Sequence, residues 1–188
     1  MSTQGRTDQL PTAAGPVFRR AGVSDAGALA AFAARSFRET FAHSTTAAHM
    51  EAHVAAAYGI EQQSVELANP GAIALLHERD GAIVAFAQVR TKAPPDVVRE
   101  RGAAELQRFY VDAPWHGRGL AQPMMAQCFA AARVLGAAAL WLSVWEHNAR
   151  AIAFYDKCGF AGVGLADFWL GSDRQVDRIM VCRLDVGA

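Results

Sequence analysis

The feature that most constrains the fold is a junction at which a strand-like segment meets a glycine-containing turn and then an apolar helical segment. The strand-like part is residues 106–111, and the turn is residues 116–121, His-Gly-Arg-Gly-Leu-Ala. Glycine lets the backbone approach a ligand closely, and the first N–H groups of a helix have no partners inside the helix. Because these groups and the helix dipole favour an anion, the junction predicts a pyrophosphate site. Tight turns also use glycine when no ligand is present, so a purely structural role stays open at this point.

A second block follows about thirty residues later, with the pattern Asn-(x)6-Tyr-(x)3-Gly-Phe formed by Asn148, Tyr155, Gly159 and Phe160. Together the two blocks resemble the Gcn5-related N-acetyltransferase (GNAT) family, whose pyrophosphate loop has the signature Gln/Arg-x-x-Gly-x-Gly/Ala. The resemblance extends over nearly the whole chain, from about residue 17 to residue 184. The chain departs from the signature at His116, and we expect this to alter one side-chain contact without abolishing a site made mainly of backbone N–H groups.

Two further segments resemble the PaiA branch of polyamine and small-amine acetyltransferases within that superfamily. One is residues 36–41, Ser-Phe-Arg-Glu-Thr-Phe, and the other is the pattern Leu-x-Arg-Phe-Tyr-Val that begins at Leu106.

The order of elements predicts an α/β or α+β protein, because strand-like and helical segments are mixed along the chain. The turn Asp80-Gly81 between two apolar runs predicts a β-hairpin. The resemblance implies the GNAT fold, a mixed and mostly antiparallel sheet of six to seven strands with helices on both faces and with strands 4 and 5 splayed apart. The expected strands are residues 17–20, 72–78, 82–90, 103–111, 140–145 and 175–184; the expected helices are residues 24–35, 46–58, 121–135 and 149–158; residues 92–102 are expected to be a loop.

Length and composition predict one domain over residues 16–188, preceded by a flexible tail over residues 1–15. Lys plus Arg and Asp plus Glu both number 18, so the net charge is zero and no nucleic-acid or membrane-surface footprint is expected. Three cysteines without metal spacing, no apolar leader and no segment of membrane-spanning length predict a cytoplasmic protein with reduced thiols.

The resemblance implies direct acetyl transfer from acetyl-coenzyme A (acetyl-CoA) to an amine, with no metal. Tyr155 is the predicted proton donor to the leaving thiolate, since a phenol with a pKa of about 10 is close to a thiol. Seven residues are two helical turns, so Asn148, Ile152 and Tyr155 share one face of the predicted helix. A structural reading remains beside this one, with Tyr155 packed on the inner face, Asn148 as the helix N-cap and Gly159 as the C-terminal stop.

Glu105 is the candidate general base, fourteen residues before Gly119, where histone-type relatives have a catalytic glutamate. Regular alternation would put Glu105, Gln107 and Phe109 on one face of the strand, and Leu106, Arg108 and Tyr110 on the other. The pKa values of an alkylammonium and a carboxylate differ by about six, or roughly 8 kcal/mol, so Glu105 needs a raised pKa or an intervening water. A solvated strand charge is the competing interpretation. A backbone N–H near Val111 is expected to bind the oxyanion.

The remaining site residues are implied by the resemblance or by their position in the predicted fold. Cofactor binding is expected from Phe109, Tyr110, Val111, His116, Gly117, Arg118, Gly119, Leu120, Ala121, Asn148, Tyr155 and Lys157. The amine pocket is expected to include Phe37, Glu39, Phe41 and His43. A polyamine pocket would need acidic residues gathered from Glu39, Glu51, Asp112 or Asp167.

Several alternatives stay open. His49 and His53, with His43 upstream, have the i, i+4 spacing of a metal pair, but Glu51 lies midway between them and not next to the first histidine, as the metalloprotease order requires. Cys158 lacks the partners of an activated nucleophile. The chain could instead be a non-catalytic acyl-CoA-binding module, or could use another acyl donor or a hydroxyl acceptor. The acceptor amine, small molecule or peptide, is not determined, and a homodimer is open as well.

Overall fold

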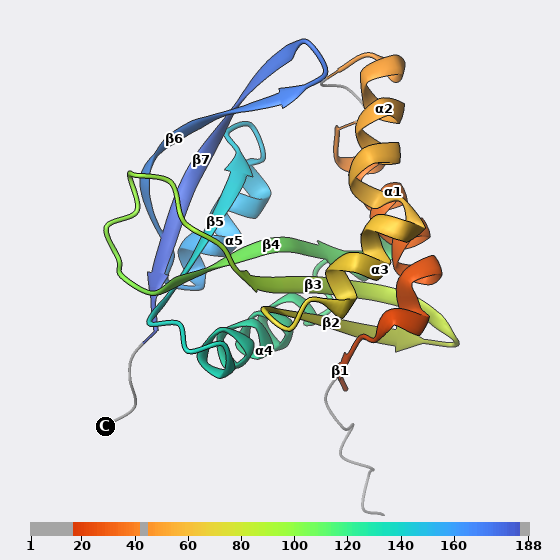
Figure 1. Cartoon of the computed structure of the whole chain (residues 1–188), viewed down its shortest axis with the longest axis horizontal. Helices are drawn as coiled ribbons and strands as arrows, with labels where there is room; N and C mark the ends of the chain where they lie inside the picture. The colour runs from red at the N-terminus through yellow and green to blue at the C-terminus, as the bar shows by residue number, and fades with distance from the viewer. Residues whose placement is uncertain (1–16, 42–44, 185–188) are drawn as a thin grey trace, which may run out of the picture.

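The structure is a computed structural model that describes residues 17–41 and 45–184 (Figure 1). Its strands are β1 (Arg19–Arg20), β2 (Ala72–Arg79), β3 (Ala82–Thr91), β4 (Ala103–Val111), β5 (Ala139–Trp145), β6 (Ala161–Leu170) and β7 (Asp173–Arg183). Its α-helices are α1 (Ala26–Phe41), α2 (Ala47–Tyr58), α3 (Ile60–Ala68), α4 (Ala121–Val134) and α5 (Ala149–Lys157). The expected mixed fold is confirmed.

The strands form a seven-stranded sheet in the order β1-β2-β3-β4-β5-β7-β6, in which β4 and β5 pair in parallel and the other neighbours are antiparallel. Helices cover both faces: α1, α2 and α3 lie on one side and α4 and α5 on the other (Figure 1). Strand alternation builds the two cores, since Leu75 packs toward α4 and α5 while its neighbour Leu76 packs toward α1 to α3.

Strands β4 and β5 separate after a short parallel ladder, as expected. The ladder holds Ala103 against Ala139, Ala104 against Leu140, and Glu105 against Trp141, and the rest of β4 pairs with β3 alone. The edge of β4 beyond Glu105 therefore faces an opening.

A β-bulge in β4 contradicts the expected regular alternation. Gln88 pairs with Arg108 and Val89 with Leu106, so Gln107 is the extra residue. Beyond the bulge the faces exchange. Glu105, Arg108 and Tyr110 therefore lie toward α1 to α3, while the side chains of Leu106, Phe109 and Val111 lie toward α4 and α5.

Two elements were not expected. The inner face of α3 is polar, with Gln63 and Glu66 buried, so it lacks an apolar repeat. Strand β6 contains Gly162 and Gly164 and is largely exposed along one edge of the sheet, which hides its strand character.

The ends of the expected elements also shift. Helix α1 begins at Ala26, after a turn in which the Asp25 carboxylate accepts a hydrogen bond from the Gly22 N–H, and it runs six residues beyond the expected end at residue 35. The proposed tail, residues 1–15, and the candidate pocket residue His43 lie outside the described residues.

Candidate active site

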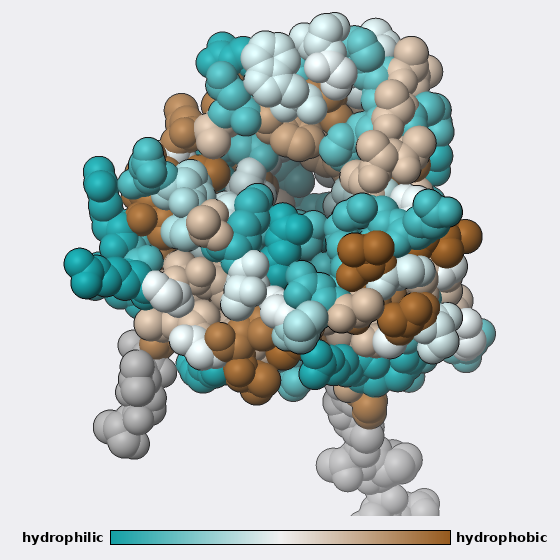
Figure 2. Space-filling view, viewed as in Figure 1, coloured by the Kyte–Doolittle hydropathy of each residue, from teal (hydrophilic) through white to brown (hydrophobic). Residues whose placement is uncertain are grey.

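A cleft of about 1590 Å³ opens where β4 and β5 separate, and it continues between α1, α2 and the β6–β7 hairpin. Figure 2 shows the surface hollowed between the hairpin side and the helical side of the molecule. Sites for one small molecule usually measure roughly 300–1,000 Å³, so this cleft has room for two substrates. Most of the expected site residues line it: Phe37, Glu39, Phe41, Glu105, Phe109, Tyr110, Val111, His116, Gly117, Gly119, Leu120, Ala121, Asn148, Tyr155 and Lys157.

The glycine turn has the geometry of an anion cradle. Gly117 and Gly119 have φ of 72° and 79°, in the left-handed region that other residues rarely adopt. A Cβ on either glycine would meet no described atom within 4 Å, so open space lies in front of both. Among the described residues, no side chain caps the N-terminus of α4, and its first N–H groups are available to a ligand.

His116, the departure from the family signature, links two parts of this site. Its Nε2–H donates to the Val111 carbonyl at 2.7 Å, and its Nδ1 lies 2.6 Å from a guanidinium nitrogen of Arg150, which must be the donor. The two partners assign the donor role to Nε2 and the acceptor role to Nδ1. Arg150, in the first turn of α5, also lines the cleft, although sequence reasoning did not select it.

Arg118 does not line the cleft. Its guanidinium lies over the ring of Trp115 at 5.7 Å, and Arg79 lies near the same ring at 5.9 Å.

The free edge of β4 presents the backbone of alternate residues. The Asp112 N–H donates to the Val84 carbonyl on β3. Because paired and unpaired positions alternate in an antiparallel ladder, Tyr110 also points its backbone groups toward β3, and Phe109 and Val111 point theirs toward the cleft. Of the three expected backbone ligands, two therefore have the right orientation.

Tyr155 is the buried residue of α5, held by the rings of Phe109, Phe154 and Phe160 at centroid distances of 6.3, 5.6 and 5.7 Å. Within the described part of the chain, no group is hydrogen-bonded to its hydroxyl, although the residue lines the cleft. Burial, with a smaller contribution from Tyr110, raises the pKa of Tyr155 well above its usual value. The phenol is therefore held in its protonated form, and its pKa is higher than the match with a thiol that the sequence analysis assumed.

Asn148 and Gly159 have the structural roles that were considered for them. The Asn148 Oδ1 accepts the Ala151 N–H at 3.1 Å and caps α5, and Gly159 follows the helix with φ of 89°. Asn148 also lines the cleft, so the cap leaves its amide N–H₂ available there.

Glu105 is buried, and both of its carboxylate oxygens are bound by cations. Arg90 Nε lies 2.5 Å from Oε2, and Lys92 Nζ lies 3.1 Å from Oε1. Both carboxylate oxygens of Glu105 are therefore engaged in ion pairs.

The side of the cleft formed by α1, α2 and β6 is aromatic. Phe37 stacks on His53 at 4.6 Å, Phe168 meets the edge of His53 at 5.6 Å, and Phe41 meets Trp145 at 5.5 Å. Burial and the nearby Arg108 lower the pKa of His53, which favours its neutral form.

The carboxylates suggested for a polyamine pocket do not gather here. Each is paired with an arginine: Glu39 and Asp112 with Arg35, Glu51 with Arg38, and Asp167 with Arg174. Of these four, Glu39 lines the cleft. Asp177 of β7, which sequence reasoning missed, lines it as well. Only the register of β7 against β5 could have revealed it, because that pairing places Asp177 opposite Trp145.

A buried polar network lies behind the aromatic side of the cleft. Arg108 forms an ion pair with Glu66 and donates to Gln63 and to the Ala57 carbonyl, joining β4 to α2 and α3. The Tyr58 and Tyr110 hydroxyls are hydrogen-bonded at 2.8 Å beside it.

His49 and His53 do not act as a pair. His49 Nδ1 lies 3.1 Å from Asp173 and its Nε2 lies 3.4 Å from Ser172, whereas the His53 ring packs on Phe37. The His49 contacts fasten the β6–β7 turn to α2 across the top of the cleft (Figure 1).

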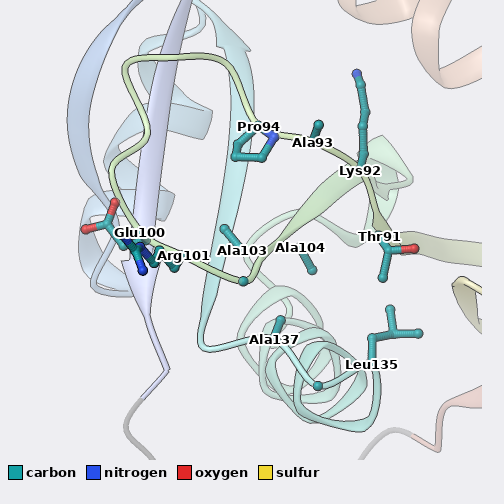
Figure 3. Close-up of a pocket in the computed structure, with 12 residues that line it drawn as sticks. Thr91, Lys92, Ala93, Pro94, Glu100, Arg101, Ala103, Ala104, Leu135 and Ala137 are labelled. Carbon is teal, nitrogen blue, oxygen red and sulfur yellow. The ribbon is translucent and has the colours of Figure 1, made fainter.

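A second hollow of about 650 Å³ lies between the loop that follows β3 and the end of α4 (Figure 3). Ala103, Ala104 and Ala137 contribute small apolar side chains, and the Lys92 side chain extends away from Leu135 and Ala137. Without converging polar groups among the described residues, this hollow offers no chemistry comparable to that of the cleft.

In the described part of the chain, no helix combines the length and the apolarity that a membrane crossing requires.

Comparisons with known proteins agree with this geometry. The profile of the acetyltransferase (GNAT) family matches residues 34–160. An uncharacterized N-acetyltransferase of Mycobacterium tuberculosis is 33% identical over 162 residues, which cover 86% of this chain and 99% of that one. A spermine/spermidine N(1)-acetyltransferase of Bacillus subtilis is 30% identical over 90 residues, 47% of this chain and 59% of that one. Among solved structures, the PaiA N-acetyltransferase of Thermoplasma acidophilum in complex with coenzyme A has a TM-score of 0.71 at 21% identity, covering 90% of this chain and 99% of that one.

Proposed function

This chain belongs to the acetyltransferase (GNAT) family, and we propose that it transfers the acetyl group of acetyl-CoA directly to a primary amine of a small molecule, with Tyr155 as proton donor. The observation that carries the proposal is the position of Tyr155. Its protonated phenol lines the same cleft as the glycine turn and the free edge of β4. A binding domain would need the turn but not the phenol.

For the cofactor, we propose that the N–H groups of the turn and of the first turn of α4 bind the pyrophosphate. Arg150 supplies the cation that the family signature places at position 116, and His116 orients it. The backbone of Phe109 pairs with the pantetheine arm along the free edge of β4, where Val111 keeps its N–H for the thioester because its carbonyl accepts from His116. Lys157, which also lines the cleft, adds positive charge near the phosphates.

The chemistry then requires few groups. The amine nitrogen attacks the thioester carbonyl carbon, and the Val111 N–H stabilises the oxyanion that forms. The carbon–sulfur bond breaks, Tyr155 protonates the departing thiolate, the amine nitrogen loses one proton to solvent in the open cleft, and solvent returns a proton to Tyr155. Glu105 holds Lys92 and Arg90 and is not our choice of proton acceptor, because both of its oxygens are engaged.

Direct transfer is favoured over an acyl-enzyme. Burial raises the pKa of the Cys158 thiol, which lowers the thiolate fraction that a nucleophile needs. The small-amine acceptor is supported by the aromatic wall and by the activity for which the Bacillus subtilis relative is named. A long polyamine is disfavoured, since the four candidate carboxylates are paired with arginines.

The test is acetyl-CoA turnover, followed by thiol release, against monoamines, diamines, polyamines, amino acids, aminoglycosides and short peptides, with coenzyme A binding measured by calorimetry. Amine-dependent thiol release supports the proposal. Tight coenzyme A binding with no release on any acceptor would replace it with the non-catalytic binding module.

A further inference from the structure

One carboxylate on the acceptor side of the cleft has no cationic partner. Among the described residues that line the cleft, the acidic side chains are Glu39, Glu105 and Asp177. Glu39 lies 3.8 Å from Arg35, and Glu105 is held by two cations. Asp177 is half-buried and accepts a hydrogen bond from the Ser143 hydroxyl, and within residues 17–41 and 45–184 no cationic side chain is paired with it. A half-buried carboxylate without a counter-ion is costly unless a ligand supplies one.

The sheet register places Asp177 on the aromatic side of the cleft. In β7 it stands between Trp145 of β5 and Ala166 of β6. Trp145 meets Phe41 of α1, and Phe168, two residues from Ala166 on the same face, meets His53 of α2. Asp177 therefore lies on the same face of the sheet as Trp145 and Phe168, whose rings meet rings of α1 and α2.

Burial raises the pKa of the Asp177 carboxyl, and the charged side chains on this side of the cleft do not compensate it. Arg108 is neutralised by Glu66, and Lys92 by Glu105. His53 is held neutral, and Tyr58 and Tyr110 are bonded to each other. His147, at the open end of β5, is 70% exposed at its side chain and stands against the edge of Trp145.

A buried hydroxyl on the facing helix also lacks a partner. Ser36 of α1 is 7% exposed, lines the cleft, and has an Oγ atom with no hydrogen-bond partner among the described residues. Buried polar atoms are normally satisfied, so Ser36 is a second, independent indication that a polar ligand occupies this side.

We propose that Asp177, oriented by Ser143, binds an ammonium group of the acceptor, and that the enzyme therefore selects slender aliphatic amines with a positive charge. In a diamine the other, neutral amino group attacks the thioester; in a monoamine the bound ammonium first loses a proton to solvent, and its nitrogen then attacks. Aromatic faces favour a cation and exclude bulky polar groups, and a single unpaired carboxylate matches a single ammonium. Amino acids and acidic peptides would bring a carboxylate toward Asp177 and are disfavoured. This inference rests on the proposed function and names the acceptor that it uses.

The test compares Asp177→Asn with wild type in steady-state acetyl transfer to short alkylamines and diamines. We expect KM for the amine to rise at least tenfold, while the dissociation constant for coenzyme A stays within twofold. Hydroxylamine, which is neutral near pH 7.5 and needs no carboxylate, should be acetylated equally well by both proteins. Ser143→Ala should raise KM for the amine by a smaller factor.

Asp167→Asn is the matched control, because it removes the same charge from the same hairpin at a residue outside the cleft. Equal KM values for Asp177→Asn and wild type overturn the inference even if transfer itself is observed. A parallel loss with hydroxylamine, or weaker coenzyme A binding, also overturns it, since Asp177 would then have a structural role. If wild type acetylates no amine at all, the proposed function is wrong, and the inference about Asp177 is wrong with it.

Discussion

His116 shows, at the scale of the residue, how a departure from a family signature is accommodated. Its imidazole fills the space between the Val111 carbonyl and the Arg150 guanidinium, at 2.7 and 2.6 Å. A cation is thereby held beside the glycine turn from a different element, α5. Arg150 therefore supplies a positive charge beside position 116, although position 116 itself is a histidine.

We therefore expect Arg150→Gln to weaken coenzyme A binding about tenfold, since one charge-assisted contact to phosphate contributes roughly 1.5 kcal/mol or more. The measurement is calorimetry with coenzyme A and with pantetheine, which lacks the phosphates. Pantetheine binding should not change. Equal losses for both ligands would contradict a phosphate role for Arg150.

Whether a site residue could be predicted from the sequence depended on where its partners lie. The glycine turn, Asn148 and Tyr155 were predicted because their meaning depends on spacing within one local segment. Asp177 and Arg150 were missed because each gains its role from a partner on another strand or loop. Composition and periodicity carry no information on such pairings.

At the scale of the element, β4 determines the site. It leaves β5 after Glu105, bulges at Gln107, and presents the backbone of Phe109 and Val111 to the cleft. The splay was expected, but the bulge was not, because Gln107 has neither the glycine nor the proline that would mark one in a sequence. The polar inner face of α3 was hidden for a related reason: Glu66 and Gln63 are buried only because Arg108 meets them.

We propose that the glycine turn and α4 form one anion-binding element, and Gly119→Ala tests this proposal. The φ of 79° makes alanine strained by about 1 kcal/mol or more, and the methyl group would project into the space reserved for the phosphates. We expect coenzyme A binding to fall at least tenfold, measured by calorimetry.

Gly81→Ala is the control for strain alone. Gly81 has nearly the same φ, 77°, and a Cβ there would also meet no described atom within 4 Å, but it lies in the β2–β3 turn. Both variants should lose similar stability in thermal unfolding. If they also bind coenzyme A equally well, the turn is not the pyrophosphate site.

In the whole molecule, the two faces of the sheet contribute different parts of the candidate site. We propose that the side with α4 and α5 binds the cofactor and that the side with α1 to α3 binds the acceptor. The β6–β7 turn reaches across to α2, where Asp173 accepts hydrogen bonds from Thr45 at 2.5 Å and from His49. The family resemblance implied this overall plan, whereas the contact of the β6–β7 turn with α2 was not expected.

The buried ion pair of Arg108 and Glu66 joins β4 to α3, and its loss should lower the stability of the whole molecule. Arg108→Met leaves Glu66 buried without a counter-ion, at a cost of about 3–5 kcal/mol in the free energy of unfolding. Denaturant unfolding measures this. Adding Glu66→Met should recover part of the lost stability. If Arg108→Met alone were as stable as wild type, the ion pair would not be needed to hold α3 on the sheet.

The most direct test of the central claim, that Tyr155 protonates the leaving thiolate of an acetyltransferase, is thiol release by Tyr155→Phe. Phenylalanine keeps the ring contacts with Phe109, Phe154 and Phe160 and removes only the hydroxyl. The account predicts at least a tenfold lower kcat, about 1.4 kcal/mol of barrier, with unchanged coenzyme A binding. Amine-dependent thiol release at the wild-type rate would contradict it.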